Sequence, residues 1–313
     1  MLKNSKKLNL LGQALLLLAT LVWGTSFVIL KDTISQVPAM YVIAIRFLFA
    51  GVVFSFVFLK KIIKASKYSL ISGVIVGLMV AGAYVTQTYG LSLTTPGRNA
   101  FVTSSYCVMC PFLLWFFFKQ KPTLKNVVCA VLCVVGIGLI ALSGDKSSGS
   151  QLLFGDGLTL ISAVFFGLQI IFLDRFQKKG ADTSVVIAVE LFTAGVVFAI
   201  ITFAFELPYY GIQKYALNTN QLLNIGYLAV ACTLFAQTAQ TVGQKFTTAN
   251  QSSLILSLES VFGMLFSVVM GAEKLSVILC IGFAVVFTAI IISELQFEKK
   301  GAQLNALEDK YGK

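Results

Sequence analysis

Long apolar stretches alternate with short polar segments along the whole chain. Ten of the stretches are about 20 residues long, which is enough for one helix to cross the hydrocarbon core of a bilayer. We expect helical spans near residues 10–30, 39–59, 69–91, 98–118, 125–143, 154–173, 184–205, 221–242, 250–270 and 275–294. The pattern therefore predicts an all-α membrane protein with ten transmembrane helices.

The composition agrees with this interpretation and narrows the function. Of the 313 residues, 57% are hydrophobic and 12% are charged, whereas a soluble domain carries about 25% charged residues. The sequence contains no His, the commonest general base and metal ligand. It also lacks a Walker-type Gly-Lys-Ser/Thr loop. We therefore expect a protein that is not an enzyme, is not driven by ATP, and uses no metal or cofactor.

The basic residues fall mainly on one side of the predicted spans. Of 24 Lys and Arg residues, 18 lie on the side that holds both termini, five lie on the other side, and Arg46 lies within a span. The positive-inside rule then places both termini in the cytoplasm. This distribution accounts for the net charge of +11 without a nucleic-acid partner. We expect a multi-pass protein of the cell membrane, of the bacterial inner-membrane type.

Polar motifs occur twice along the chain. Residues 87–95 and 240–248 share the pattern Gln-Thr-x-Gly-x-x-x-Thr-Thr, and Trp23-Gly24 is matched by Phe166-Gly167. Because each repeat holds five spans, an odd number, the second repeat is expected to enter the membrane from the opposite side. Inverted repeats are typical of transporters with a substrate site near the midplane. The predicted organisation is a cytoplasmic head (1–9), a first five-helix repeat (10–143), a second, inverted repeat (154–295) and a charged cytoplasmic tail (296–313).

Motifs in both repeats resemble those of a known family. They are Val22-Trp23-Gly24-Thr25-Ser26-Phe27, Thr94-Thr95-Pro96-Gly97-Arg98-Asn99-Ala100-Phe101, Leu258-Glu259-Ser260-Val261-Phe262 and Gly271-Ala272-Glu273-Lys274. In this order, over nearly the whole chain, they resemble the EamA-type family of the drug/metabolite transporter superfamily. The resemblance implies a ten-helix inverted-repeat carrier, usually an exporter of amino acids, related metabolites or drugs. Ser260 departs from the family pattern, in which many members have Pro.

Polar side chains within the spans are the candidate substrate ligands, because an unpaired polar group is costly in a bilayer. One helical face of the third span carries Tyr84, Gln87 and Thr88, and the matching face of the eighth carries Gln237, Gln240 and Thr241. We predict that both stripes line a common cavity, the alternative being hydrogen bonding between packed helices. The remaining candidate ligands are Trp23, Ser26, Asn99, Tyr106, Gln169 and Glu259.

Charged residues within or beside the spans form a second group of candidates. Glu259 lies about 13 Å into its span at 1.5 Å per residue, and it is a cation ligand, a proton acceptor or a hydrogen-bonded structural carboxyl. Arg46 and Glu190 occupy matching positions, where they pair with each other, serve their own halves or line a water-filled path. Arg98 opens the fourth span, at a helix end that disfavours cations. It either guides an anionic group or snorkels to the interface.

Together these features predict a secondary transporter that works by alternating access around a midplane cavity. The oligomeric state, monomer or homodimer, and the coupling ion stay open, with protons as a candidate partner. The expected partners are a small-molecule solute and membrane lipid. One alternative is a multidrug-type exporter of organic cations that uses Glu259, and another is a receptor or scaffold without transport. The preferred substrate is a small amphipathic metabolite such as an amino acid, moved in the export direction.

Overall fold

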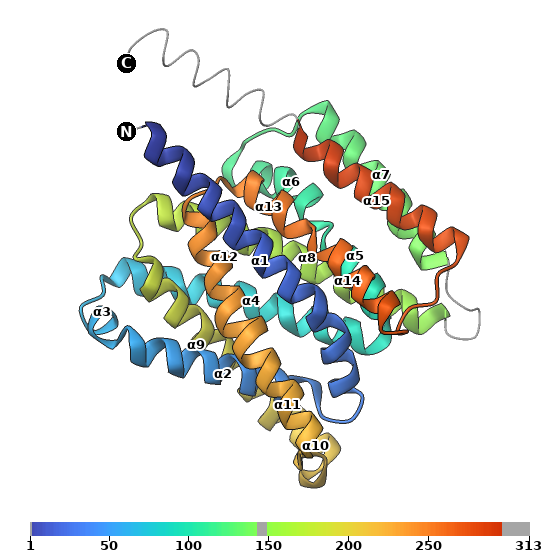
Figure 1. Cartoon of the computed structure of the whole chain (residues 1–313), viewed down its shortest axis with the longest axis horizontal. Helices are drawn as coiled ribbons and strands as arrows, with labels where there is room; N and C mark the ends of the chain where they lie inside the picture. The colour runs from blue at the N-terminus through green and yellow to red at the C-terminus, as the bar shows by residue number, and fades with distance from the viewer. Residues whose placement is uncertain (1, 143–148, 296–313) are drawn as a thin grey trace.

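The computed structural model describes residues 2–142 and 149–295, and every regular element in them is a helix (Figure 1). The helices of the first half are α1 (Leu2–Ile34), α2 (Ala39–Val57), α3 (Leu59–Ile63), α4 (Lys67–Leu93), α5 (Pro96–Thr103), α6 (Tyr106–Phe118) and α7 (Leu124–Leu142). Those of the second half are α8 (Gly149–Lys178), α9 (Thr183–Ile201), η1 (Thr202–Glu206), α10 (Leu207–Tyr210), η2 (Ile212–Tyr215), α11 (Thr219–Tyr227), η3 (Leu228–Phe235), α12 (Ala236–Lys245), α13 (Ala249–Ser257), α14 (Glu259–Val269) and α15 (Val277–Leu295). The segments η1 and η3 are π-helical.

Eight helical stretches in the described residues are long and apolar enough to cross a membrane. Two further apolar helices, Leu124–Ile140 and Val277–Ile292, are shorter. Each of these segments falls on one of the predicted spans. The prediction of an all-helical protein with membrane-spanning helices is confirmed for the part of the chain that the structure describes.

The predicted fourth and ninth spans are each interrupted near the middle, at matching positions. The junction between α5 and α6 lies at residues 104–105, and the junction between α13 and α14 lies at residue 258. The hydroxyls of Ser105 and Ser257 each donate to the backbone carbonyl three residues earlier. Such bonds compete with the backbone N–H groups of the helix for the same acceptors, and these two lie where the apolar pattern alone predicts a continuous span.

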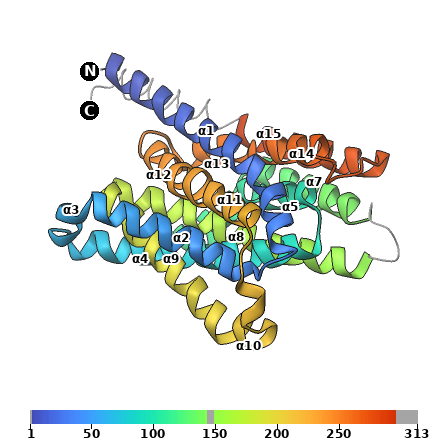
Figure 2. The ribbon, with the colours of Figure 1, turned by 60° about the horizontal axis from the view of Figure 1, so that its bottom comes forward.

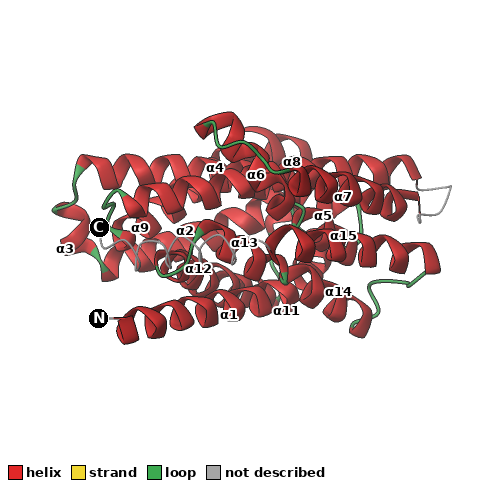
Figure 3. Cartoon of the chain, turned by 90° about the horizontal axis from the view of Figure 1, so that it is seen from above, coloured by secondary structure: helices red, strands yellow, loops and turns green. Residues whose placement is uncertain are grey.

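The packing of the helices follows the division into two halves. Helix α1 packs against α12 and α14, whereas α8 packs against α4 and α6, and the pairs α2–α9 and α7–α15 join the halves directly. Exchanging each helix for its counterpart in the other half leaves this set of neighbours essentially unchanged. The long helices lie side by side in the bundle (Figures 2 and 3). Two of the close helix pairs, α4–α8 and α1–α12, also join the halves.

Two pairs of glycines bring helices of opposite halves into backbone contact. A Cβ atom on Gly12 of α1 would lie 2.8 Å from the Gly243 carbonyl oxygen of α12. A Cβ atom on Gly90 of α4 would lie 2.8 Å from the Gly155 carbonyl oxygen of α8. Gly12 matches Gly155 and Gly90 matches Gly243 in the sequence repeat. The same crossing is therefore built twice, once at each end of the bundle.

Candidate functional site

A small cavity lies between the two halves, and its volume is about 30 Å³. Its wall combines aromatic and aliphatic side chains with a few polar ones, including Arg46. A cavity of this size holds a water molecule but not a metabolite, because ligand pockets are typically ~300–1,000 Å³. Seven of the twelve predicted substrate ligands line it: Trp23, Ser26, Tyr84, Gln87, Tyr106, Gln240 and Glu259.

The wall of the cavity is built from matching residues of the two halves. Gln87 of α4 and Gln240 of α12 both line it, and so do Trp23 of α1 and its counterpart Phe166 of α8. The equivalent positions 106 and 259 contribute Tyr and Glu, at the start of α6 and of α14. Each repeat therefore supplies one side of the same cavity, and the chemistry of the two sides differs.

Five of the predicted ligands lie behind this wall. Asn99 donates to the Gln87 carbonyl, and Gln169 accepts from the Gln240 side chain at 3.2 Å. Gln237 donates to Glu190 at 2.8 Å. The two remaining candidates, Thr88 and Thr241, are also buried away from the cavity.

Four of these residues, Asn99, Gln169, Gln237 and Thr241, make hydrogen bonds within or between packed helices, whereas the Thr88 hydroxyl has no partner among the described residues. In α4 Gln87 lines the cavity and Thr88 does not, and in α12 Gln240 lines it and Thr241 does not. Gln237 is the second residue of α12 and does not line the cavity, although its sequence counterpart Tyr84 does.

Two charged side chains reach the cavity without a partner that neutralises them. Arg46 is 1% exposed; its Nε donates to Thr233 Oγ1 at 3.0 Å, and its Nη1 has no hydrogen-bond partner in the described part of the chain. Its guanidinium carbon lies 6.0 Å from the centroid of the Tyr84 ring. Among residues 2–142 and 149–295, no hydrogen bond or ion pair holds the Glu259 carboxyl. The expectation of a hydrogen-bonded structural carboxyl is therefore not what the structure shows.

Arg46 and Glu190 do not pair with each other, which corrects one of the alternatives raised by the sequence. Arg46 is held by Thr233, whereas Glu190 accepts from Gln237 and lies outside the cavity wall. The repeat places the two residues at matching sequence positions, but α2 and α9 are expected to enter the membrane from opposite sides. Equal distances along the two helices then correspond to different depths.

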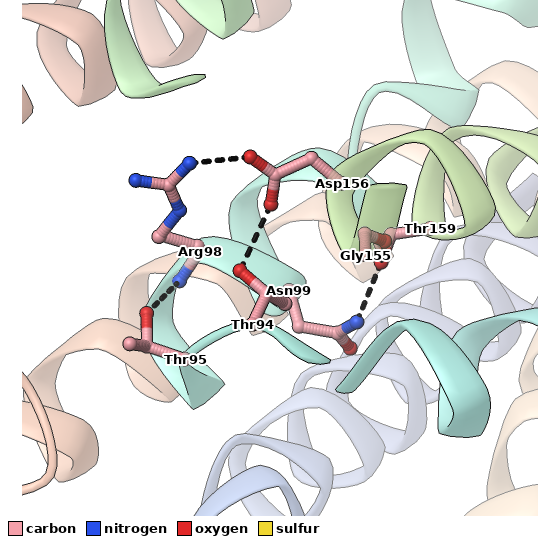
Figure 4. A network of polar contacts seen from close by, with 7 residues as sticks. All are labelled: Thr94, Thr95, Arg98, Asn99, Gly155, Asp156 and Thr159. Atoms are coloured by element: carbon pink, nitrogen blue, oxygen red, sulfur yellow. Dashed lines mark hydrogen bonds and ion pairs between the residues drawn. The ribbon is translucent and has the colours of Figure 1, made fainter. Parts of the chain in front are cut away.

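Arg98 belongs to a separate polar cluster at the junction of α5 and α8 (Figure 4). Its guanidinium forms an ion pair with Asp156, and Thr94 donates to the other oxygen of the same carboxyl at 2.9 Å. Arg98 is 3% exposed, so it neither snorkels to an interface nor offers a free cation to an anionic solute. Sequence reasoning missed Asp156, although a carboxyl within an apolar run is itself a signal.

The loop after α14 adds Glu273 to this cluster. The Glu273 side chain lies beside Thr95, Gly97 and Arg98, and its Oε2 has no hydrogen-bond partner in the described part of the chain. Burial raises the pKa of the Glu273 carboxyl, while the neighbouring Thr95, Gly97 and Arg98 oppose the shift. At the opposite end of the bundle the corresponding contacts are neutral. There Asn9 of α1 donates to the Phe246 carbonyl and to the side chain of Gln251.

Comparison with known proteins gives consistent results over most of the chain. A model of the EamA-like transporter family matches residues 10–142 and again residues 153–295. An uncharacterized transporter of Archaeoglobus fulgidus is 28% identical over 283 residues, which cover 90% of this chain and 85% of the relative. The uncharacterized transporter YoaV of Bacillus subtilis is 23% identical and covers 90% and 96%, respectively. One crystal structure shares the fold with a TM-score of 0.66 and 18% identity, over 91% of this chain and 96% of the other.

Proposed function

Since the chain belongs to the EamA-like transporter family, we propose that it is a secondary transporter that exports a small zwitterionic metabolite, such as an amino acid, across the cell membrane. The family predicted from the sequence motifs is thereby confirmed, and with it a protein that transports rather than catalyses. The observation that carries the substrate class is the cavity between the halves. One carboxyl and one guanidinium reach this cavity, and neither forms an ion pair within residues 2–142 and 149–295.

The proposed substrate uses both of these charges. The Glu259 carboxylate is a partner for an ammonium group, and the Nη side of Arg46 is a partner for a carboxylate, which a guanidinium binds in a planar, two-pronged contact. Between them, Trp23, Tyr84 and Phe166 offer aromatic surface to an apolar side chain. A solute that carries an ammonium group, a carboxylate and an apolar group finds a partner for each of these groups in the cavity wall. A polyanion does not, because Arg46 is the only cation among the described residues that line this cavity.

Alternating access between ten spans accounts for the small volume of the cavity. At about 30 Å³ the site is too small for a metabolite, so helices must separate before one binds. The two Gly–Gly crossings, α1 with α12 and α4 with α8, lie at opposite ends of the bundle. Under the proposal each crossing closes one side of the membrane, and the repeats are inverted relative to each other. The exchange symmetry of the helix neighbours supports this arrangement.

Solute flux in proteoliposomes tests the proposed function. Purified protein is reconstituted, and uptake of radiolabelled L-amino acids is measured beside the Glu259→Gln variant. The control is Asp174→Asn, which removes a carboxyl charge where Asp174 pairs with Lys178 on α8, away from the cavity. We expect the wild type and the control to transport at least one amino acid, and Glu259→Gln to lose most of that flux. Absence of flux for every amino acid in the wild type would overturn the proposal.

Export of organic cations is the second candidate function, because the Glu259 carboxyl is unpaired and aromatic rings surround the cavity. Aromatic faces attract cations with about 0.5–2 kcal/mol. The Arg46→Gln variant separates the two functions, since only a zwitterion needs the guanidinium. If cations are the substrate, their transport survives Arg46→Gln and depends on Glu259. If zwitterions are the substrate, both substitutions abolish transport.

A further inference from the structure

The helical stretch formed by α11, η3 and α12 is not a uniform α-helix. Its middle part, Leu228–Phe235, is π-helical, so its hydrogen bonds reach five residues along the chain rather than four. The Thr233 hydroxyl follows the same spacing and donates to the Leu228 carbonyl at 2.9 Å. π-Helical turns inside longer helices are often found at functional sites, which makes the surroundings of this turn informative.

Two side chains from the first half are anchored on this turn. The indole N–H of Trp23, from α1, donates to the Cys232 carbonyl at 2.7 Å. The Nε of Arg46, from α2, donates to the Thr233 hydroxyl oxygen at 3.0 Å. Trp23 and Arg46 both line the cavity, whereas Cys232 and Thr233 do not. The turn is therefore a support that stands behind the cavity and holds two of its walls.

The direction of these bonds fixes the guanidinium of Arg46. The Thr233 proton goes to Leu228, so the lone pairs of the Thr233 oxygen are left to accept from Arg46. Because the Nε is occupied, the opposite edge of the planar guanidinium, which carries the Nη atoms, points away from the turn. Its Nη1 has no partner among the described residues. A buried cation with one free donor beside a cavity is arranged to receive an acceptor from a ligand.

The second repeat alone provides this support. The sequence repeat places Val80 in α4 at the position that Thr233 has in the second half, and a valine offers no acceptor. The matching partner is also different, because Glu190 stands where Arg46 does and is held by Gln237 instead. The Arg46–Thr233 contact is therefore one of the features by which the two halves diverge. The contact therefore supports only the side of the cavity that carries Arg46.

We propose that Thr233, presented by the π-helical turn, is the positioning residue that orients Arg46 toward the carboxylate of the substrate. The inference rests on the proposed function for the nature of the ligand. It adds that selectivity for a carboxylate depends on a residue that does not touch the ligand. Replacing Thr233 by Val keeps the shape of the side chain and removes the acceptor, so the guanidinium loses its fixed orientation. Recognition of an ammonium group by Glu259, on the other side of the cavity, is unaffected.

The test compares each amino acid with its amide, which keeps the ammonium group and the side chain but lacks the carboxylate. The probes are L-alanine, L-leucine and L-phenylalanine with their three amides, and binding is measured to the full-length protein in lipid nanodiscs. The variants are Thr233→Val, Thr233→Ser and Thr233→Ala. The control is Thr238→Val, on the same helix, whose hydroxyl donates to the Leu234 carbonyl and does not reach the cavity.

We expect Thr233→Val to weaken binding of the amino acid about tenfold, the effect of about 1.4 kcal/mol, and to leave binding of the amide unchanged. Thr233→Ser keeps the wild-type ratio of amino-acid affinity to amide affinity because it keeps the acceptor oxygen. The control Thr238→Val leaves this ratio unchanged. Thr233→Ala gives the same result as Val and serves if the Val variant does not fold. An unchanged ratio in a folded Val or Ala variant overturns this inference alone. If the wild type binds none of the three amino acids and also transports no amino acid in the flux assay, the proposed function fails and the inference fails with it.

Discussion

The close crossing of α4 and α8 predicts that replacement by alanine destabilises the protein at Gly155 but not at Gly157, although both glycines belong to α8. A Cβ atom on Gly155 would lie 2.9 Å from the Gly90 carbonyl oxygen and 3.0 Å from the Leu93 Cβ, whereas a Cβ atom on Gly157 would meet nothing within 4 Å. Alanine at either position gains helix propensity, up to about 1 kcal/mol. Only Gly155→Ala also forces two backbones apart, and overpacking of this kind costs about 1–3 kcal/mol.

The difference between the two variants isolates the overpacking contribution, because both gain the same propensity. Melting temperatures are measured in one detergent and at one scan rate, since membrane proteins often unfold irreversibly. For a protein of this size, 1 kcal/mol corresponds to roughly 1.5 °C. Gly157→Ala should therefore melt at or above the wild-type temperature, and Gly155→Ala at least about 1.5 °C below Gly157→Ala. Equal melting temperatures for the two variants would refute the reasoning that the backbones touch at Gly155.

Three further predictions follow from the charged groups. Asp156→Asn removes the carboxylate that pairs with buried Arg98 and should destabilise the protein by about 3–5 kcal/mol; a loss of melting temperature no larger than that of a surface variant would contradict this. Burial raises the pKa of the Glu273 carboxyl in the folded protein. Its contribution to stability is therefore fully present below the pKa of the unfolded chain, about 4.3, and is lost as the pH rises through the raised pKa of the folded protein. Glu273→Gln should flatten that part of a plot of melting temperature against pH, and an unaltered slope would speak against it. Lys178 is 62% exposed in its pair with Asp174, so Lys178→Ala should change the unfolding free energy by less than about 1 kcal/mol, as measured by chemical denaturation.

The apolar pattern was sufficient to predict the helical class and the positions of the helices, because the length needed to cross a bilayer is a strong constraint. It was also sufficient to find Gln87 and Gln240, since a polar side chain repeated within two apolar runs is rare without a reason. What the pattern could not predict is the rotation of each helix. Thr88, Gln237 and Thr241 were expected at the cavity, but the contacts that set helical phase are made by residues far away in the sequence.

The partners of the charged residues were beyond the reach of the sequence for the same reason. Asp156 lies 58 residues from Arg98, and Thr233 lies 187 residues from Arg46. Asp156 and Thr233 each interrupt an apolar run, and such an interruption suggests a buried polar contact. We used this criterion to select Gln237 from the sequence but did not apply it to Thr233. The π-helical turn has no recognisable signature in the residues 228–235. Only the three-dimensional structure shows that the side chains of Trp23 and Arg46 donate hydrogen bonds to this turn.

The twin Gly–Gly crossings have a consequence for how such proteins diverge. Under the proposed mechanism, two closures made of identical backbone contacts would open with equal free energy in a perfectly symmetric molecule. The preference for facing one side must then come from the side-chain contacts around the crossings, which include an ion pair beside Gly155 and neutral amide hydrogen bonds beside Gly12. A few substitutions in these contacts suffice to change that preference. The resting orientation of the carrier can therefore change during evolution while its helix packing and its solute cavity stay the same.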